Sequence, residues 1–108
     1  MKKYKVLIDP QAKEDLKEIF FYVLSNDNLS SANKLLDALE KTCSKLETYP
    51  ERGHIPQELR LTGINRYLEI HYKPYRVIYE ISKNYIYIHC VLDGRRNIQE
   101  ILAERLLR

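Results

Sequence analysis

Four side chains in predicted strands could together hold a phosphate and move protons. Glu69 and His71 are two residues apart, so they share one side of their strand. Arg76 and His89 can project from neighbouring strands onto the same face. Cleavage of RNA through its 2′-hydroxyl needs a base, an acid and a cation that stabilises the phosphorane. These residue types supply all three, but an ordinary solvated sheet face would also contain them, so the sequence leaves both interpretations open.

The sequence contains none of the common motifs for metals, cofactors or nucleotides. It has no glycine-rich phosphate loop, no Cys-x-x-Cys or His-x-x-x-His spacing and no Gly-x-Ser-x-Gly elbow. His54, His71 and His89 are far apart in the sequence. We therefore expect no metal site and no cofactor. Cys43 and Cys90 have no second cysteine nearby, so we expect both to be buried, reduced thiols.

Positive charge is concentrated near the C-terminal end of the chain. The net charge of +3 is too small to indicate a nucleic-acid-binding protein by itself. However, Arg95, Arg96 and Arg105 lie close together in the sequence, whereas acidic residues cluster between positions 14 and 18. A basic end of this kind could contact an acidic target, and a solvated surface is the alternative.

The N-terminal half predicts a strand followed by two antiparallel helices. Residues 5–8 (Lys-Val-Leu-Ile) predict a short first strand. Asp9-Pro10 is typical of a helix start, with the aspartate accepting from free backbone N–H groups. Apolar residues then recur every three or four positions to about Leu24, and the same period returns after a polar break until Pro50 ends it. Because the break is short, the two helices should form a hairpin.

The C-terminal half predicts three antiparallel strands and a closing helix. From Tyr67 the apolar period changes to two, over residues 67–72, 75–81 and 85–92. Strict alternation directs one apolar set toward the helices: Val77, Tyr79, Ile81, Ile86, Ile88 and Cys90. The opposite face then carries Arg76, Glu80, Tyr87 and His89. Helical spacing returns at the end of the chain with Ile98, Ile101, Leu102 and Leu106.

The predicted element order is therefore β-α-α-β-β-β-α. This order indicates an α+β fold in which an antiparallel sheet carries a helical hairpin on one face, within a single domain over residues 1–108. The first strand should join the sheet, and the other, partly polar face should stay open. No apolar run reaches the roughly 18 residues that a membrane span needs. We accordingly expect the cytoplasm as the compartment.

Three segments together resemble the RelE/ParE superfamily, the growth-arresting toxins of bacterial toxin–antitoxin pairs. They are residues 49–53 (Tyr-Pro-Glu-Arg-Gly), 75–79 (Tyr-Arg-Val-Ile-Tyr) and 91–97 (Val-Leu-Asp-Gly-Arg-Arg-Asn). The segments occur in the same order as in the superfamily, at matching places in the predicted β-α-α-β-β-β-α order, and the resemblance covers the whole chain. It implies a type II toxin that is neutralised by an antitoxin encoded beside it. The extended C-terminal segment of such an antitoxin adds a helix or strand to exposed apolar surface.

The RelE branch of the superfamily is implied to cleave messenger RNA in the ribosome. Arg76 and Arg96 match its two arginine positions. Its lysine positions fall instead on Tyr67 and Glu69, and its C-terminal tyrosine position falls near Leu102. A glutamate repels the scissile phosphate, and a leucine can neither donate nor accept a proton. If the chain were such a ribonuclease, its candidate catalytic residues would be Arg76, Arg96, Glu69, His71 and His89.

The ParE branch resembles this chain better, through the Pro-Glu-Arg-Gly loop, the long helical hairpin and the Gly-Arg-Arg turn. It implies a non-enzymatic toxin that poisons DNA gyrase and traps cleaved DNA. The target-binding residues would then be Arg76, Arg95, Arg96 and Arg105. The antitoxin-binding residues would be Ile98, Ile101, Leu102 and Leu106, whose apolar face should pack either on the domain itself or on the antitoxin. The alternatives are a RelE-like ribosome-dependent endoribonuclease and a non-toxic family member that acts as an interaction module.

Overall fold

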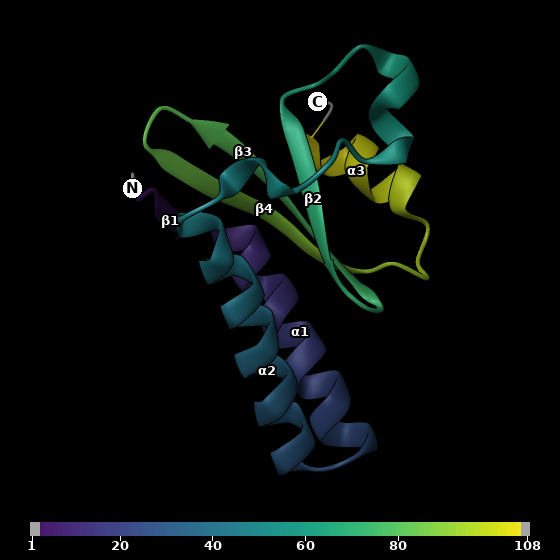
Figure 1. Ribbon diagram of the computed structural model, residues 1–108. Helices are drawn as coiled ribbons and strands as arrows, with labels where there is room; N and C mark the ends of the chain where they lie inside the picture. Colours follow the sequence, from purple (N-terminus) through teal and green to yellow (C-terminus); the bar gives the residue numbers. More distant parts are fainter. Residues whose placement is uncertain (1–2, 107–108) are drawn as a thin grey trace.

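The computed structural model describes residues 3–106, which form a four-stranded sheet packed against helices (Figure 1). In chain order the elements are β1 (Lys5–Ile8), α1 (Pro10–Asn26), α2 (Leu29–Ser44), β2 (Tyr67–Tyr72), β3 (Tyr75–Ser82), β4 (Tyr85–Asp93) and α3 (Ile98–Leu106). Short 3-10 helices occupy the connection between α2 and β2, namely η1 (Lys45–Glu47), η2 (Pro50–Arg52) and η3 (Gln57–Thr62). The predicted order β-α-α-β-β-β-α is confirmed, and the predicted loop before β2 is partly helical.

The helical hairpin forms where the sequence predicts it, but the start of α1 differs in one detail. Pro10 occupies the first turn of α1, where its missing N–H is not needed. Asp9 lies at the N-cap position, yet its side chain accepts no cap hydrogen bond, so that prediction is wrong. Instead, the backbone N–H of Asp9 donates to the carbonyl of Ile88 (3.0 Å) and holds this end of α1 against β4. Asn28 caps α2 through its side chain, which accepts from the N–H of Ser31 at 2.8 Å.

The sheet has the strand order β1-β4-β3-β2 and is mixed rather than fully antiparallel. β2, β3 and β4 are the three antiparallel strands that the sequence predicts. β1 pairs with β4 in the parallel direction, with Val6 opposite Ile86. Tight turns force antiparallel pairing, whereas a strand that is connected through helices can pair in either direction. The parallel edge was therefore not encoded in the local pattern.

A β-bulge in β4 changes which side chains face the hairpin. Tyr79 pairs with Ile88, but the preceding Ile78 pairs with Cys90, so His89 is an extra residue in the ladder. The extra residue reverses the alternation, and Cys90 packs with Ile78 on the face opposite the hairpin. The prediction that Cys90 shares a face with Ile88 is therefore wrong, because strict alternation holds only without a bulge.

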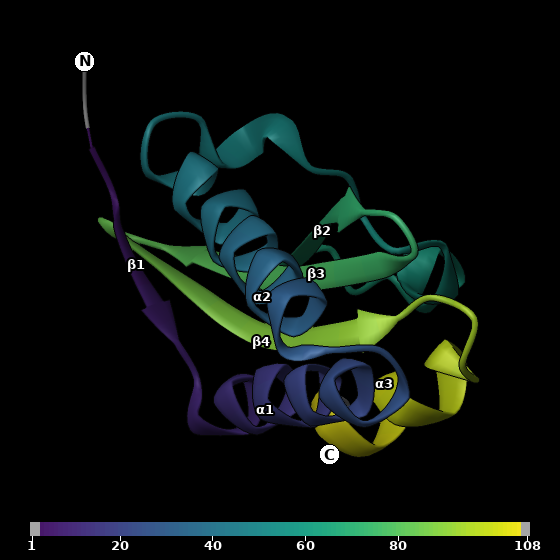
Figure 2. The same cartoon turned by 90° about the horizontal axis from the view of Figure 1, so that it is seen from below.

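The apolar side chains form two cores, one on each face of the sheet. In Figure 2, α2 lies in front of the strands, and α1 lies beside β4. The core beneath them contains Leu16, Leu39, Val77, Tyr79 and Ile88. The core on the other face, beneath α3 and η3, contains Leu59, Ile78, Leu92, Ile98 and Leu102. The face that the sequence predicts to be open is thus partly covered, and none of the helices within residues 3–106 has the length and apolar composition to cross a bilayer.

The two cysteines are buried free thiols, as expected. Cys43 lies in the hairpin-side core and Cys90 in the α3-side core. Burial raises the pKa of Cys43 to about 11 and the pKa of Cys90 to about 12. Neither thiol therefore ionises near neutral pH, and both behave as small apolar side chains.

Candidate functional site

Arg76 lies at the centre of a buried ion-pair cluster on the α3-side face of the sheet. Its Nε donates to Oε1 of Glu69 on β2 (2.6 Å), and its terminal nitrogens donate to both carboxylate oxygens of Glu58 in η3 (2.9 and 2.7 Å). The side chains of Arg76 and Glu58 are each 13% exposed, and that of Glu69 is 4% exposed. Hydrogen bonds from Arg76 lower the pKa of Glu58, and those to Glu58 and Glu69 raise the pKa of Arg76. Three of the five guanidinium N–H groups thus bind two carboxylates.

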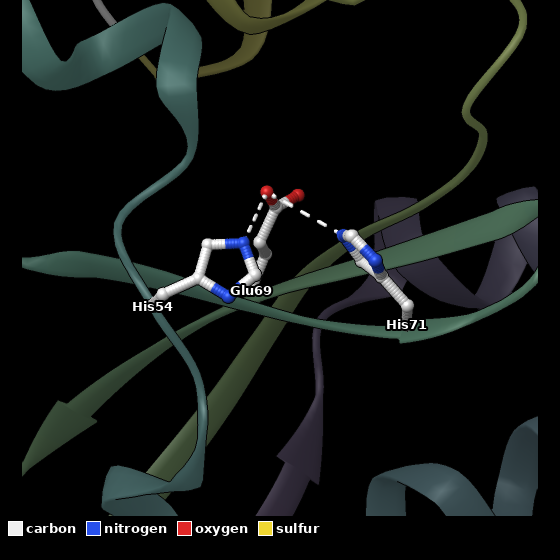
Figure 3. Close-up of side chains that lie close together, drawn as sticks. All are labelled: His54, Glu69 and His71. Atoms are coloured by element: carbon white, nitrogen blue, oxygen red, sulfur yellow. Dashed lines mark hydrogen bonds and ion pairs between the residues drawn. The ribbon is translucent and has the colours of Figure 1, made fainter.

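Two histidines approach the other carboxylate oxygen of Glu69 (Figure 3). Nε2 of His54 lies 3.1 Å from Oε2 of Glu69, and Nε2 of His71 lies 3.5 Å from the same oxygen. His71 follows Glu69 by two residues on β2, so both side chains point to one face. His54 comes from the connection before β2, where its N–H donates to the Glu69 carbonyl (3.1 Å) and its carbonyl accepts from the Glu69 N–H (2.7 Å). The two imidazole rings meet edge to face, 5.4 Å apart between centroids.

The structure brings together three of the four side chains that the sequence placed in an acid–base group. Glu69 and His71 lie on one face of β2, and Arg76 lies opposite His71 on β3. His89 does not join them, because its Nε2 pairs with Oε1 of Glu80 at 2.9 Å. The group predicted from the sequence is therefore incomplete in the fold.

His54 and Glu58 belong to the same cluster, and the sequence pattern did not reveal either one. Both lie in the irregular connection between α2 and β2, where no period predicts a spatial neighbour. A buried carboxylate and a buried guanidinium need hydrogen-bonding partners. The charged residues Glu69 and Arg76 within predicted strands were therefore the only sign in the sequence that another segment had to supply polar partners.

The charge of the cluster opposes phosphate chemistry. Two carboxylates and one guanidinium carry a formal charge of −1 when the histidines are neutral. A phosphate would be repelled by that charge, and the carboxylates of Glu58 and Glu69 would compete with it for the Arg76 guanidinium. The arrangement therefore suits an internal ion pair or a cation better than a nucleic-acid backbone.

The Pro-Glu-Arg-Gly loop positions His54 in this fold. The hydroxyl of Tyr79 donates to the carbonyl of Pro50 (2.5 Å) and accepts from the N–H of Gly53 (3.1 Å). A β-carbon on Gly53 would lie 2.5 Å from that hydroxyl and 2.6 Å from the Glu69 carbonyl, closer than van der Waals contact allows. Burial raises the pKa of Tyr79 to about 12, so the hydroxyl keeps its proton. The loop is thereby anchored to β3, and His54 is the next residue along the chain.

Two exposed arginines lie on the turn between β4 and α3. Arg95 is 74% exposed, and the Asp93 carboxylate accepts from its backbone N–H, its Nε and its Nη2. This pairing lowers the pKa of Asp93. Arg96 is exposed and makes no side-chain hydrogen bond or ion pair within residues 3–106. It borders a hollow of about 330 Å³ together with Tyr22 of α1 and Tyr75 of β3.

Arg105, which the sequence predicts as a target contact, is enclosed in the protein. Its terminal nitrogens donate to both carboxylate oxygens of Asp15 in α1 (3.1 and 2.9 Å), and Nη2 also donates to the carbonyl of His89 (2.9 Å). Asp15 accepts in addition from the backbone N–H of Val91 at 3.0 Å. The side chains of Arg105 and Asp15 are 14% and 10% exposed. Arg105 therefore joins α3 to α1 and β4, and its guanidinium is not displayed to a target.

The apolar stripe of α3, which the sequence predicts as an antitoxin contact, is buried by the chain itself. Ile98, Leu102 and Leu106 are 3%, 1% and 8% exposed. Ile101 is partly buried at the margin of the same core. The predicted helical spacing is correct, but the turn after β4 folds α3 back onto the sheet, so the stripe builds the α3-side core. It offers little open surface to a partner in this structure.

An apolar groove on the helical hairpin is open to solvent. The groove has a volume of about 550 Å³, and its apolar lining consists of Ile8, Leu16, Phe20, Phe21 and Leu36. Phe21 is 58% exposed, and the nearby Tyr22 and Leu29 are 68% and 56% exposed. Large apolar side chains gathered on an exposed surface are typical of protein interaction sites. The sequence pattern did not predict this groove, because it could not show which apolar residues stay uncovered.

Comparison with known proteins identifies the family. The family model described as ParE toxin of type II toxin-antitoxin system, parDE, matches residues 6–98. The match spans most of the chain, and the protein belongs to the ParE toxin family of type II toxin–antitoxin systems. Membership implies an antitoxin as partner, and it confirms the superfamily resemblance that the three sequence segments carry.

Individual relatives agree with this assignment. The chain is similar to the curated Toxin ParE3 of Caulobacter vibrioides, with 28% identity over 91 residues that cover 84% of this chain and 87% of that protein. It is also similar to a chain from the structure described as Chromosomal ParDE TA system from P. aeruginosa, with a TM-score of 0.68 and 13% identity. That likeness covers 82% of this chain and 94% of the other, and it confirms the α+β fold.

Proposed function

We propose that this ParE-family protein arrests growth in the cytoplasm by inhibiting DNA gyrase, and that it does not cleave RNA. The observation that carries the proposal is the occupation of Arg76, since Glu58 and Glu69 bind the guanidinium that a ribonuclease would turn toward the phosphate. A net charge of −1 around that guanidinium opposes the extra negative charge of a phosphorane. Leu102, at the position of the RelE tyrosine, is 1% exposed and cannot transfer a proton.

In this proposal, Arg95 and Arg96 contact the target. They display two guanidinium groups on one exposed turn, and guanidinium groups bind carboxylates and phosphates in the same bidentate geometry. Tyr22, which is 68% exposed, borders the same hollow as Arg96 and adds aromatic contact area. Arg76 and Arg105 support the fold instead, because carboxylates from distant segments hold both in sites that are only 13% and 14% exposed, whereas Arg95 pairs with the neighbouring Asp93 on an exposed turn.

The antitoxin binds the hairpin groove in the same proposal, rather than the stripe of α3. The floor of the groove is apolar, and its rim includes Lys13 and Lys17 of α1 and Glu40 of α2. An amphipathic segment with apolar anchors and acidic flanks matches that surface. Phe21→Asp should therefore weaken the complex with the neighbouring antitoxin about tenfold or more, because it places a charge at the apolar contact. Leu61→Asp, at a fully exposed leucine of η3, is the matched control and should bind normally.

Expression of the protein without its antitoxin in the source organism tests the choice of target. We expect DNA-damage signalling and cell filamentation before protein synthesis falls, and purified gyrase should yield linearised DNA in the presence of the protein. The double variant Arg95→Ala/Arg96→Ala should lose these effects, whereas His71→Ala and His89→Ala should keep them. Prompt loss of amino-acid incorporation with codon-positioned messenger cuts, abolished by either histidine variant, would establish the ribonuclease instead. Normal growth with soluble protein would favour a non-toxic interaction module.

A further inference from the structure

We propose that His54, Glu69 and His71 form a binding site for a divalent transition metal ion, and that Zn²⁺ fits it best. One ring nitrogen of each histidine and one carboxylate oxygen of Glu69 all lie within 4.8 Å of one another (Figure 3). The two nitrogen-to-oxygen distances are 3.1 and 3.5 Å. Tetrahedral ligands about 2.1 Å from a zinc ion lie about 3.4 Å from one another, so both nitrogen-to-oxygen distances already match a zinc coordination sphere. Two histidines and one glutamate with a fourth, open position are an established zinc ligand set.

The backbone holds these donors in place before any ion binds. His54 and Glu69 are joined by a pair of backbone hydrogen bonds, and His71 lies on the same face of β2 as Glu69. The residue before His54 is fixed in turn by the hydroxyl of Tyr79. A site that is already ordered loses less conformational entropy on binding than one that must be assembled.

Arg76 and Glu58 supply the outer shell of the site. Oε1 of Glu69 accepts from Nε of Arg76 at 2.6 Å, so the carboxylate is oriented with Oε2 toward the two histidines. Metal-binding carboxylates are commonly held by such an outer hydrogen bond. Glu58 offsets the charge of Arg76, which leaves the cluster with a net charge of −1 that attracts a cation. Because the Glu69 side chain is only 4% exposed, water screens this charge weakly.

Solvent can reach the site on the side of the histidines. The side chains of His54 and His71 are 53% and 40% exposed, and hollows of about 320 and 240 Å³ lie beside them. An ion can therefore enter, with water as its fourth ligand. Lys45, Arg52 and Arg60 also border these hollows, but all three are exposed and hydrated, so their repulsion is screened.

A bound ion would join the connection before β2 to the strand itself, and this effect goes beyond the proposed function. It concerns the isolated toxin chain and needs neither gyrase nor antitoxin. The sequence predicted no metal site, because the three ligands follow no recognised spacing and His54 meets Glu69 only through the fold. An ion that binds the native state alone also raises the melting temperature.

Calorimetric titration of the untagged, chelator-treated full chain with zinc chloride tests the proposal. We expect saturable binding of one ion per chain, weakened about tenfold or more by His54→Ala and by His71→Ala. His89→Ala is the matched control, since His89 pairs with Glu80 outside the cluster, and it should bind zinc like the original chain. Zinc should raise the melting temperature of the original chain and of His89→Ala, but not that of the His54→Ala/His71→Ala double variant.

Both replaced rings are substantially exposed, so the variants should keep the fold, which circular dichroism verifies. Titration with Co²⁺ reports the coordination geometry of the site, because a tetrahedral Co²⁺ ion absorbs strongly in the visible range. Absence of saturable zinc binding would overturn the proposal. Zinc binding that survives the loss of both His54 and His71, or that falls equally in His89→Ala, would overturn it as well.

Discussion

Four arginines of this protein lie in two contrasting environments. Arg76 and Arg105 are 13% and 14% exposed, and each makes bidentate hydrogen bonds to a carboxylate from a distant segment. Arg95 and Arg96 lie on an exposed turn, where water solvates the charge. A charge that has been removed from water depends on its partner, whereas an exposed ion pair contributes little to stability. The first pair should therefore support the fold, and the second pair should be accessible to a target, with Arg95 exchanging its contact with Asp93 for the target.

Arg76→Ala should cause the largest loss of stability. It leaves the carboxylates of Glu58 and Glu69 close together without their shared cation, in a site that water reaches poorly. Breaking a buried pair in this way should lower the free energy of unfolding by about 4 kcal/mol, measured by urea denaturation. The combination of Arg76→Met with Glu58→Gln and Glu69→Gln removes the unmatched charges and should recover part of the loss. A loss below about 1 kcal/mol for Arg76→Ala would show that the cluster contributes no more to stability than a solvated surface ion pair.

Arg105→Ala should cost slightly less, about 3 kcal/mol of unfolding free energy. Asp15 would lose its cation, but it would keep the hydrogen bond from the Val91 N–H. A double-mutant cycle with Asp15→Asn separates the energy of the ion pair from the energy that the aliphatic part of Arg105 contributes through packing. Strong coupling between the two substitutions is expected, and strictly additive effects would show that Arg105 acts through packing alone.

The Glu58 pair should make stability depend on acid. Because Arg76 lowers the pKa of Glu58 below its ordinary value of 4.5, the pair stabilises the fold fully above that pH. This contribution should disappear as the pH falls through the lowered pKa, since the unfolded chain then binds the proton more readily. Urea denaturation from about pH 7 to about pH 3 should therefore give a steeper loss for the original chain than for Glu58→Gln.

The control for this pH series is Glu104→Gln, at an exposed glutamate of α3. It should follow the pH profile of the original chain. If Glu58→Gln also followed that profile, the ion pair with Arg76 would not be the origin of the acid dependence.

The smallest effect on stability is expected at the exposed turn. Arg95→Ala and Arg96→Ala should leave the melting temperature unchanged, because the lost interactions are solvated. The same variants should nevertheless reduce growth arrest if the turn contacts the target. A drop in melting temperature as large as that of Arg105→Ala would show that the turn, too, is a structural element and would remove the contrast between the two pairs.

The sequence by itself determined the elements of this protein and its family. The alternation of apolar and polar residues predicted the bounds of β2 without error. The spacing of apolar residues at three and four positions predicted α3 from Ile98 to Leu106. These features are local, since they depend on neighbours within a few residues. The three short segments that resemble the superfamily were likewise visible as sequence, and the family assignment confirmed them.

Only the tertiary structure decided which partner each polar side chain has. Arg105 pairs with Asp15, which lies 90 positions earlier in the sequence. His54 pairs with Glu69 through an isolated β-bridge that no sequence period predicts. One extra residue in β4 was enough to move Cys90 to the other face of the sheet. The physical reason is that a buried charge must be compensated by whatever group lies near it in space. Local patterns specify helices and strands, whereas the distances between them arise only when the whole chain packs.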